Sequence, residues 1–198
     1  MATEAWIETN EAEDVAGSIR HALRCSKFVN EDPQAWKWFM LSLHSALQGA
    51  CVCHLTTTAA PLGAITESNS KEWIKYFEER RLNKSATPPK TCLMSLPGLL
   101  KAVRNPNSTD SHFGGKNIAI SDKELNWLRL LHNEIRNQFI HFEPTGWVIE
   151  ISGLPDFAKL VARIVADILD AGWGFRHMED NQRDAMRRDL DRILSITT

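Results

Sequence analysis

Residues 121–141, with the sequence SDKELNWLRLLHNEIRNQFIH, predict the most sharply bounded helix of the chain. Ser121 can cap the first turn, and Glu124, three residues later, can return a hydrogen bond to the backbone of Ser121, which makes a capping box. Apolar side chains then recur at helical spacing. Pro144 stops the pattern, because the residue before a proline disfavours helical backbone angles. This stretch therefore predicts a long, well-capped amphipathic helix.

Similar patterns predict helices along most of the chain. The segment 33–56 is apolar on most of its circumference, which indicates a central, buried helix. The segment 154–171 is amphipathic and is followed by Gly172, a common helix stop. Only Trp147–Ile151 looks extended, as one short strand or part of a hairpin. We therefore predict an all-α fold: a bundle of about six to seven helices with one short strand or hairpin after the helix at 121–141. The remaining helices are expected at about 11–29, 69–82, 97–104 and 180–195.

A single domain accounts for residues 1–198. Residues 1–10 are expected to form a tail, and residues 105–120 an exposed loop, since much of that segment is Asn, Ser and Gly. The helix within 180–198 is heavily charged and has a narrow apolar stripe, so we expect an addition that packs outside the bundle or against a second copy. The helix at 69–82 is expected to bury three aromatic side chains, Trp73, Tyr76 and Phe77.

Composition and charge indicate an ordinary globular protein. The 198 residues are 43% apolar and 24% charged, and the formal net charge is -2. Such a chain cannot rely on overall electrostatic attraction to nucleic acid, although a local basic groove can still bind it. The opening MATEAWIETNEAEDV lacks the apolar centre of a signal peptide, and no segment has the unbroken apolar length that a bilayer requires. The four cysteines form no C-x-x-C pair, which fits reduced thiols. We expect a cytoplasmic protein with no membrane segment.

The end of the helix at 121–141 carries three side chains with catalytic chemistry: Arg136, Asn137 and His141. At about 100° per residue, Asn137 and His141 lie roughly 40° apart, while Arg136 lies roughly 140° from His141 and must reach around the helix. Arginine offers a planar set of donors for a phosphate, and histidine exchanges a proton near neutral pH. These are the parts required for metal-independent RNA cleavage, in which the 2′-hydroxyl of the substrate attacks the neighbouring phosphate.

The sequence RNQFIH at 136–141 resembles the R-x-x-x-x-H motif of HEPN-domain proteins, including the polar residue directly after the arginine. Its position is also similar: near the end of a long helix, after an apolar helical pair and before another helix. The resemblance covers about residues 11–172 and implies an all-α bundle. It further implies a homodimer in which two copies of the motif form one cleft. Many proteins of that family are metal-independent endoribonucleases, often toxins, phage-defence effectors or RNA-processing factors.

Carried over to this chain, the resemblance implies that His141 is the general acid/base. Arg136 would stabilise the phosphate, and Asn137 would orient His141 or the phosphate. The expected partners are RNA, a second copy of the chain, and an antitoxin or larger effector protein. The alternative function is a catalytically inactive helical module that binds RNA or a protein partner. Five further side chains are expected to contact RNA: Lys75, Arg80, Arg81, Lys84 and His132.

Plainer interpretations of the same residues stay open. Arg136 and His141 can simply complement the dipole at a helix C-terminus. His132, one turn before Arg136, can be a solvated neighbour. His44 and Gln48, one turn apart on the central helix, can be satisfied polar groups of the core. The basic side chains can likewise belong to a solvated face.

No metal or cofactor is expected. Cys51, Cys53 and His54 are close in sequence, but one helix cannot direct all three toward one ion. The Glu-x-x-His pairs of metal-binding bundles are absent from the sequence, as are the glycine-rich loops that bind nucleotides.

Overall fold

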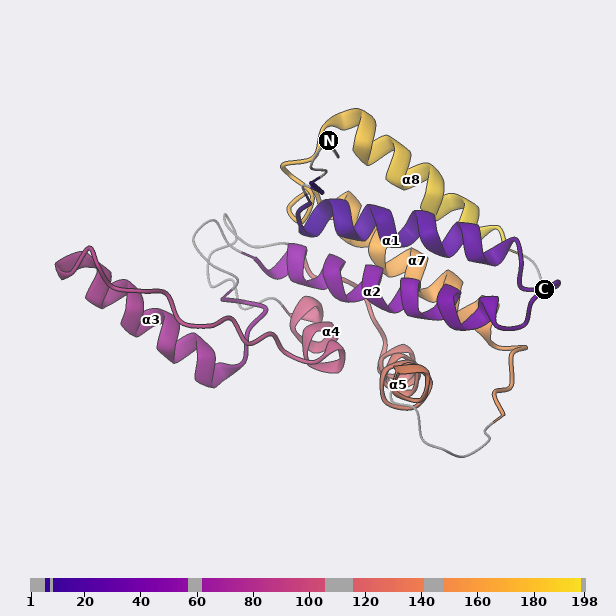
Figure 1. Cartoon of the computed structure of the whole chain (residues 1–198), viewed down its shortest axis with the longest axis horizontal. Coiled ribbons are helices and arrows are strands. Elements are labelled where there is room, and N and C mark those ends of the chain that lie inside the picture. The colour runs from indigo at the N-terminus through magenta and orange to yellow at the C-terminus, as the bar shows by residue number, and fades with distance from the viewer. Residues whose placement is uncertain (1–5, 8, 57–61, 106–115, 141–147, 197–198) are drawn as a thin grey trace, which may run out of the picture.

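The structure is a computed structural model that describes residues 6–7, 9–56, 62–105, 116–140 and 148–196. The predicted all-α fold is confirmed, and no strand occurs within these ranges. Figure 1 shows α1, α2, α7 and α8 side by side as a bundle, with α3 set apart from it. In chain order the elements are α1 (Glu11–Ser26), α2 (Ala35–Leu55), α3 (Glu67–Leu82), α4 (Leu96–Arg104), α5 (Asp122–Leu130), the π-helical turn η1 (Leu131–Arg136), α6 (Asn137–Ile140), α7 (Leu154–Ala171) and α8 (Asp180–Leu194).

The helix α2 lies at the centre of the bundle, as its apolar circumference predicts. It contacts α1, α4, α7 and η1, so apolar side chains are covered on several of its sides. Phe39, Leu43 and Leu47 on α2 are almost completely buried. The helix α1 approaches α2 closely at Gly49, where an added Cβ atom would lie 2.7 Å from Cγ2 of Val15. This burial of apolar surface supplies the main driving force for the fold.

The helices α7 and α8 complete the bundle. The helix α7 ends at Gly172, whose φ of 79° is the left-handed conformation that glycine adopts without strain. The helix α8 lies against α7 and α1, with Met186, Leu190 and Ile193 buried. Its apolar stripe therefore packs against helices of its own chain, which is one of the two expected arrangements. Among the described helices, none is both long and apolar enough to cross a membrane.

The helix that starts after Ser121 has the predicted start but an unexpected course. Glu124 N–H donates to the Ser121 hydroxyl, and Ser121 N–H donates to the Glu124 carboxylate at 2.7 Å, so the capping box is present. After α5 the backbone widens into η1 before α6 restores the α-helix. Wide turns of this kind occur frequently at functional sites. The angles expected for an ideal α-helix do not hold across this turn.

The helix α3 and the segment that runs back along it, residues 67–92, form what we call the α3 arm (Figure 1). Asn69 fastens the two halves, because its amide donates to the Lys90 carbonyl and accepts from Cys92 N–H, both at 2.8 Å. The arm projects from the bundle, so the bundle does not cover the aromatic side of α3. The expectation of a buried aromatic side is therefore wrong, and only half-buried rings in contact with one another are found: Trp73, Tyr76 and Phe77.

Two further expectations about irregular segments need correction. The strand expected at Trp147–Ile151 is absent from residues 148–151, and Trp147 lies outside the described residues. A strand needs a neighbour to pair its backbone, and here Val148 is 97% exposed. The loop expected to be exposed over 105–120 packs at its end, since Ile118 and Ile120 are buried. Ile118 N–H also donates to the Val103 carbonyl at 3.0 Å.

Candidate functional site

Two histidines from distant parts of the sequence meet beside the wide turn. Nε2 of His44, on α2, lies 2.9 Å from Nδ1 of His132, on η1, and the two residues are 88 positions apart. Their rings are nearly parallel, with 5.2 Å between centroids and 14° between planes. Because both atoms are imidazole nitrogens, one ring must donate the proton and the other must accept it. The contact between α2 and η1 brings the pair together.

Arg136 and His44 line the same groove. This groove, of about 750 Å³, lies between α1, α2 and the end of the π-helical turn, and we call it the Arg136 groove. One guanidinium N–H of Arg136 donates to the side-chain oxygen of Asn137 at 2.8 Å. A guanidinium carries five N–H donors, so a single bond to Asn137 orients the group without using up its capacity.

The walls of the Arg136 groove differ in character. Glu11 and Asp14 line it from α1, and Arg136 lines it from the end of η1. Gln48 contributes a polar side chain from α2, one turn after His44. An anionic ligand is therefore favoured next to Arg136 and disfavoured near α1.

The histidine pair is neutral near pH 7. Burial, together with the nearby His132 and Arg136, lowers the pKa of His44 to about 4. Burial and Arg136 also lower the pKa of His132. Both effects penalise a positive imidazole, because a charged ring loses hydration in the protein and is repelled by the guanidinium. A bound phosphate adds a negative charge, which favours the protonated rings and therefore raises the pKa values of His44 and His132.

The structure brings together only part of the predicted site. Arg136 lines the groove, and its side chain donates a hydrogen bond to Asn137. His132 is paired with His44 rather than being a solvated neighbour. His141 lies outside the described residues. The four remaining predicted RNA contacts lie on the α3 arm, away from the bundle, and none of them lines the described part of the groove: Lys75, Arg80, Arg81 and Lys84.

Sequence reasoning missed that His44 and His132 meet. The spacing of His44 and Gln48, one turn apart on the central helix, drew attention to this face of α2. It did not indicate that a histidine 88 positions later would complete a pair. The wide turn η1 also has no evident signal in the sequence, since residues 131–136 carry neither proline nor glycine.

The residues considered for zinc have separate surroundings. Burial raises the pKa of the Cys51 thiol and raises that of the Cys53 thiol to about 12, which favours the protonated form of both. Nε2 of His54 lies 2.9 Å from the Lys116 carbonyl oxygen. Across the described ranges, no group of three or more His, Cys, Asp or Glu side chains is placed to hold a metal ion.

Comparison of the chain with protein-family models, with curated proteins and with solved structures finds no match.

Proposed function

We propose that this chain is a HEPN-like, metal-independent endoribonuclease whose site lies in the Arg136 groove. The observation that carries the proposal is the shared groove, which both Arg136 and His44 line. Asn137 accepts a hydrogen bond from Arg136, and His132 pairs with His44. Phosphate chemistry without a metal requires an arginine that binds the phosphate and a histidine that exchanges protons, and we assign these roles to Arg136 and His141.

In the proposed reaction, the 2′-hydroxyl of one ribose attacks the adjacent phosphorus. The hydroxyl proton passes to a general base, and the 5′-oxygen of the next nucleotide leaves with a proton from a general acid. The products are a 2′,3′-cyclic phosphate and a 5′-hydroxyl. His141 is the expected acid/base, and Arg136 stabilises the extra negative charge that develops on the phosphate oxygens.

The groove supports a specific position for the phosphate. Glu11 and Asp14 repel an anion from the α1 wall, whereas Arg136 attracts it to the wall at the end of η1. A phosphate beside Arg136 also lies near the His44–His132 pair and restores its basicity by offsetting the charge of the guanidinium. We assign the His44–His132 pair a positioning role. Because both rings are neutral at pH 7, they add no second positive charge beside Arg136 before a phosphate binds.

The proposal includes a homodimer and a cytoplasmic role in a toxin–antitoxin or defence system, with an antitoxin or effector as a further partner. Gln138 and Ile140, which follow the arginine, are exposed, so the end of the helix is accessible to a second copy. Light scattering coupled to size exclusion measures the oligomeric state directly; a monomer at every accessible concentration contradicts the two-motif cleft.

Incubation of labelled RNA with the protein in EDTA tests the catalytic proposal. Arg136→Ala and His141→Ala are each expected to reduce cleavage by about 100-fold or more, the typical effect of losing an anion donor or a general acid/base. Arg188→Ala and His177→Ala are matched controls, because both side chains are exposed and lie on α8 and just before it. Cleavage that survives both site substitutions contradicts the assignment of the site.

The alternative, a non-catalytic binding module, also has an observation in its favour. Leu93 and Ile140 line the groove and are 42% and 44% exposed, which provides apolar contact area for a protein segment. Glu11 and Asp14 would add complementarity to a basic residue of that segment. Absence of cleavage, together with a defined complex whose formation is weakened by Ile140→Ser, favours this function over the ribonuclease.

A further inference from the structure

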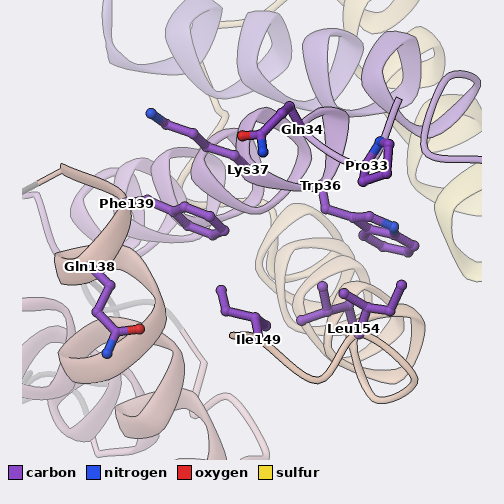
Figure 2. A pocket seen from close by; sticks show the side chains of 9 residues that line it. Pro33, Gln34, Trp36, Lys37, Gln138, Phe139, Ile149 and Leu154 are labelled. Atoms are coloured by element: carbon purple, nitrogen blue, oxygen red, sulfur yellow. The ribbon is translucent and has the colours of Figure 1, made fainter. Parts of the chain in front are cut away.

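A second cavity lies on the other side of the short helix α6. Its volume is about 420 Å³, within the range of pockets that hold small ligands. Figure 2 shows the rings of Trp36 and Phe139 on opposite sides of this space, with Ile149 and Leu154 below it and Gln34 above. We call it the Trp36 cavity.

The Trp36 ring is held in place before any ligand arrives. It is half-buried, packs against the core, and makes an edge-on contact with Phe39 at 5.6 Å and 76° between ring planes. Phe139 also packs against the core from the other wall. Because both rings are anchored, a planar ligand can stack in the cavity without first ordering them.

Hydrogen-bonding groups lie at the mouth of the same cavity. Within the described part of the chain, the side-chain amide of Gln34 makes no hydrogen bond, and the residue is exposed. Lys37 also lines the cavity, and its ammonium lies 5.0 Å from the centre of the Trp38 ring. An amide can pair with the N6 and N7 edge of adenine, and aromatic rings stack on any base. Two aromatic rings and an amide together suit a purine base better than they suit a purely apolar ligand.

The position of the Trp36 cavity ties it to the Arg136 groove. Lys37, Leu41, His44 and Gln48 follow one another at helical spacing on one face of α2. Lys37 lines the cavity, whereas the other three line the groove. At about 1.5 Å per residue, Lys37 and His44 are about 10 Å apart along the helix axis. The end of η1 and the helix α6 lie between the groove and the cavity: Arg136 and Ile140 line the groove, and Phe139 lines the cavity.

We propose that the Trp36 cavity binds one purine base, adenine by preference, of the RNA strand whose phosphate lies beside Arg136. This inference rests on the proposed ribonuclease function and gives it a base preference. Trp36 stacks on the base, Gln34 pairs with its edge, and the face of α2 between the two spaces carries the intervening backbone.

Binding to the full-length chain is measured by isothermal titration with adenosine 5′-monophosphate, uridine 5′-monophosphate and ribose 5-phosphate. Adenosine monophosphate is expected to bind more tightly than uridine monophosphate, and both more tightly than ribose 5-phosphate, which lacks a base. Trp36→Leu and Gln34→Ala are each expected to weaken adenosine monophosphate binding by about tenfold. Trp6→Leu is the control, because Trp6 is 86% exposed and does not line the cavity.

Gln34→Ala keeps the test valid if Trp36→Leu impairs folding, because the Gln34 side chain is exposed and outside the core. Equal binding of adenosine monophosphate and ribose 5-phosphate, or unchanged binding in Gln34→Ala, overturns the inference. A second arm compares oligoadenylate with oligouridylate of equal length in the Arg136→Ala background. Preference for oligoadenylate supports an RNA base as the ligand, whereas its absence contradicts that source even if the free nucleotide binds. If the wild type binds the base but does not cleave RNA, the ribonuclease proposal is refuted and the base-binding site is retained.

Discussion

Replacing His44 by glutamine is expected to change how the stability of the fold depends on pH. In the unfolded chain, a histidine takes up its proton near pH 6.5. In the folded chain, burial, His132 and Arg136 lower the pKa of His44 to about 4. Between these values the unfolded chain binds more protons than the folded chain, so stability falls as the pH falls. Well above pH 6.5 the effect vanishes, because His44 is then neutral in both the folded and the unfolded chain.

The magnitude follows from the two pKa values. At pH 4.5, protonation of His44 in the unfolded chain favours unfolding by about 2.5 kcal/mol relative to pH 7. The wild type is therefore expected to lose about 2.5 kcal/mol more stability than His44→Gln between these two pH values. Glutamine keeps a polar group opposite His132, so the comparison removes the titration without emptying the site. The lowered pKa of His54 acts in the same direction in both proteins and cancels from the difference.

Urea unfolding of the two proteins at pH 7.0, 6.0, 5.0 and 4.5 provides the measurement. His177→Gln serves as the control, because His177 is exposed on the surface next to α8. The control is expected to follow the wild type at each pH. Parallel stability curves for wild type and His44→Gln would show that His44 titrates as it does in the unfolded chain, and this would refute the reasoning about its burial.

Three further substitutions test the fold through chemical or thermal unfolding. Gly172→Ala places a residue with a Cβ atom at a φ of 79° and is expected to lower the free energy of unfolding by about 1 kcal/mol. The control Gly153→Ala, at a negative φ with open space around it, should not destabilise the fold. Equal effects of the two substitutions contradict the strain argument. Leu128→Ala removes a fully buried side chain and is expected to cost about 2–5 kcal/mol, while Leu82→Ala, 94% exposed on the α3 arm, changes little; similar losses argue against the described core. Ser121→Ala removes the cap of α5 and is expected to cost about 1 kcal/mol, so an unchanged midpoint means that the capping box contributes nothing.

The features that the sequence predicts well depend on residues close together in the chain. The capping box needs only Ser121 and Glu124, and the end of α7 needs only Gly172. Likewise, the central position of α2 follows from its own apolar composition. The contact of Arg136 with Asn137 joins adjacent residues, so the sequence places these two together whatever the rest of the fold.

The features that the sequence does not predict depend on packing between distant segments. The pairing of His44 with His132 requires α2 to meet η1 in one register. The aromatic side of α3 looks like a core face, but whether a bundle covers it depends on where the arm projects. The residues 148–151 carry strand-forming side chains, yet no neighbouring strand is present among the described residues to pair with them. Local preference is a weak guide wherever tertiary contacts decide the outcome.

The α3 arm has a consequence for how this protein can be divided. Its two ends meet, because Thr66 N–H donates to the Cys92 carbonyl and Met94 N–H to the Ala64 carbonyl, on either side of the Ile65–Leu93 bridge. The α3 arm therefore leaves and re-enters the bundle at one place, and a short turn can replace residues 67–92 without separating the flanking segments. A variant without the α3 arm lacks the basic residues of the arm but keeps Arg136 and His44, so it tests the arm and the Arg136 groove independently.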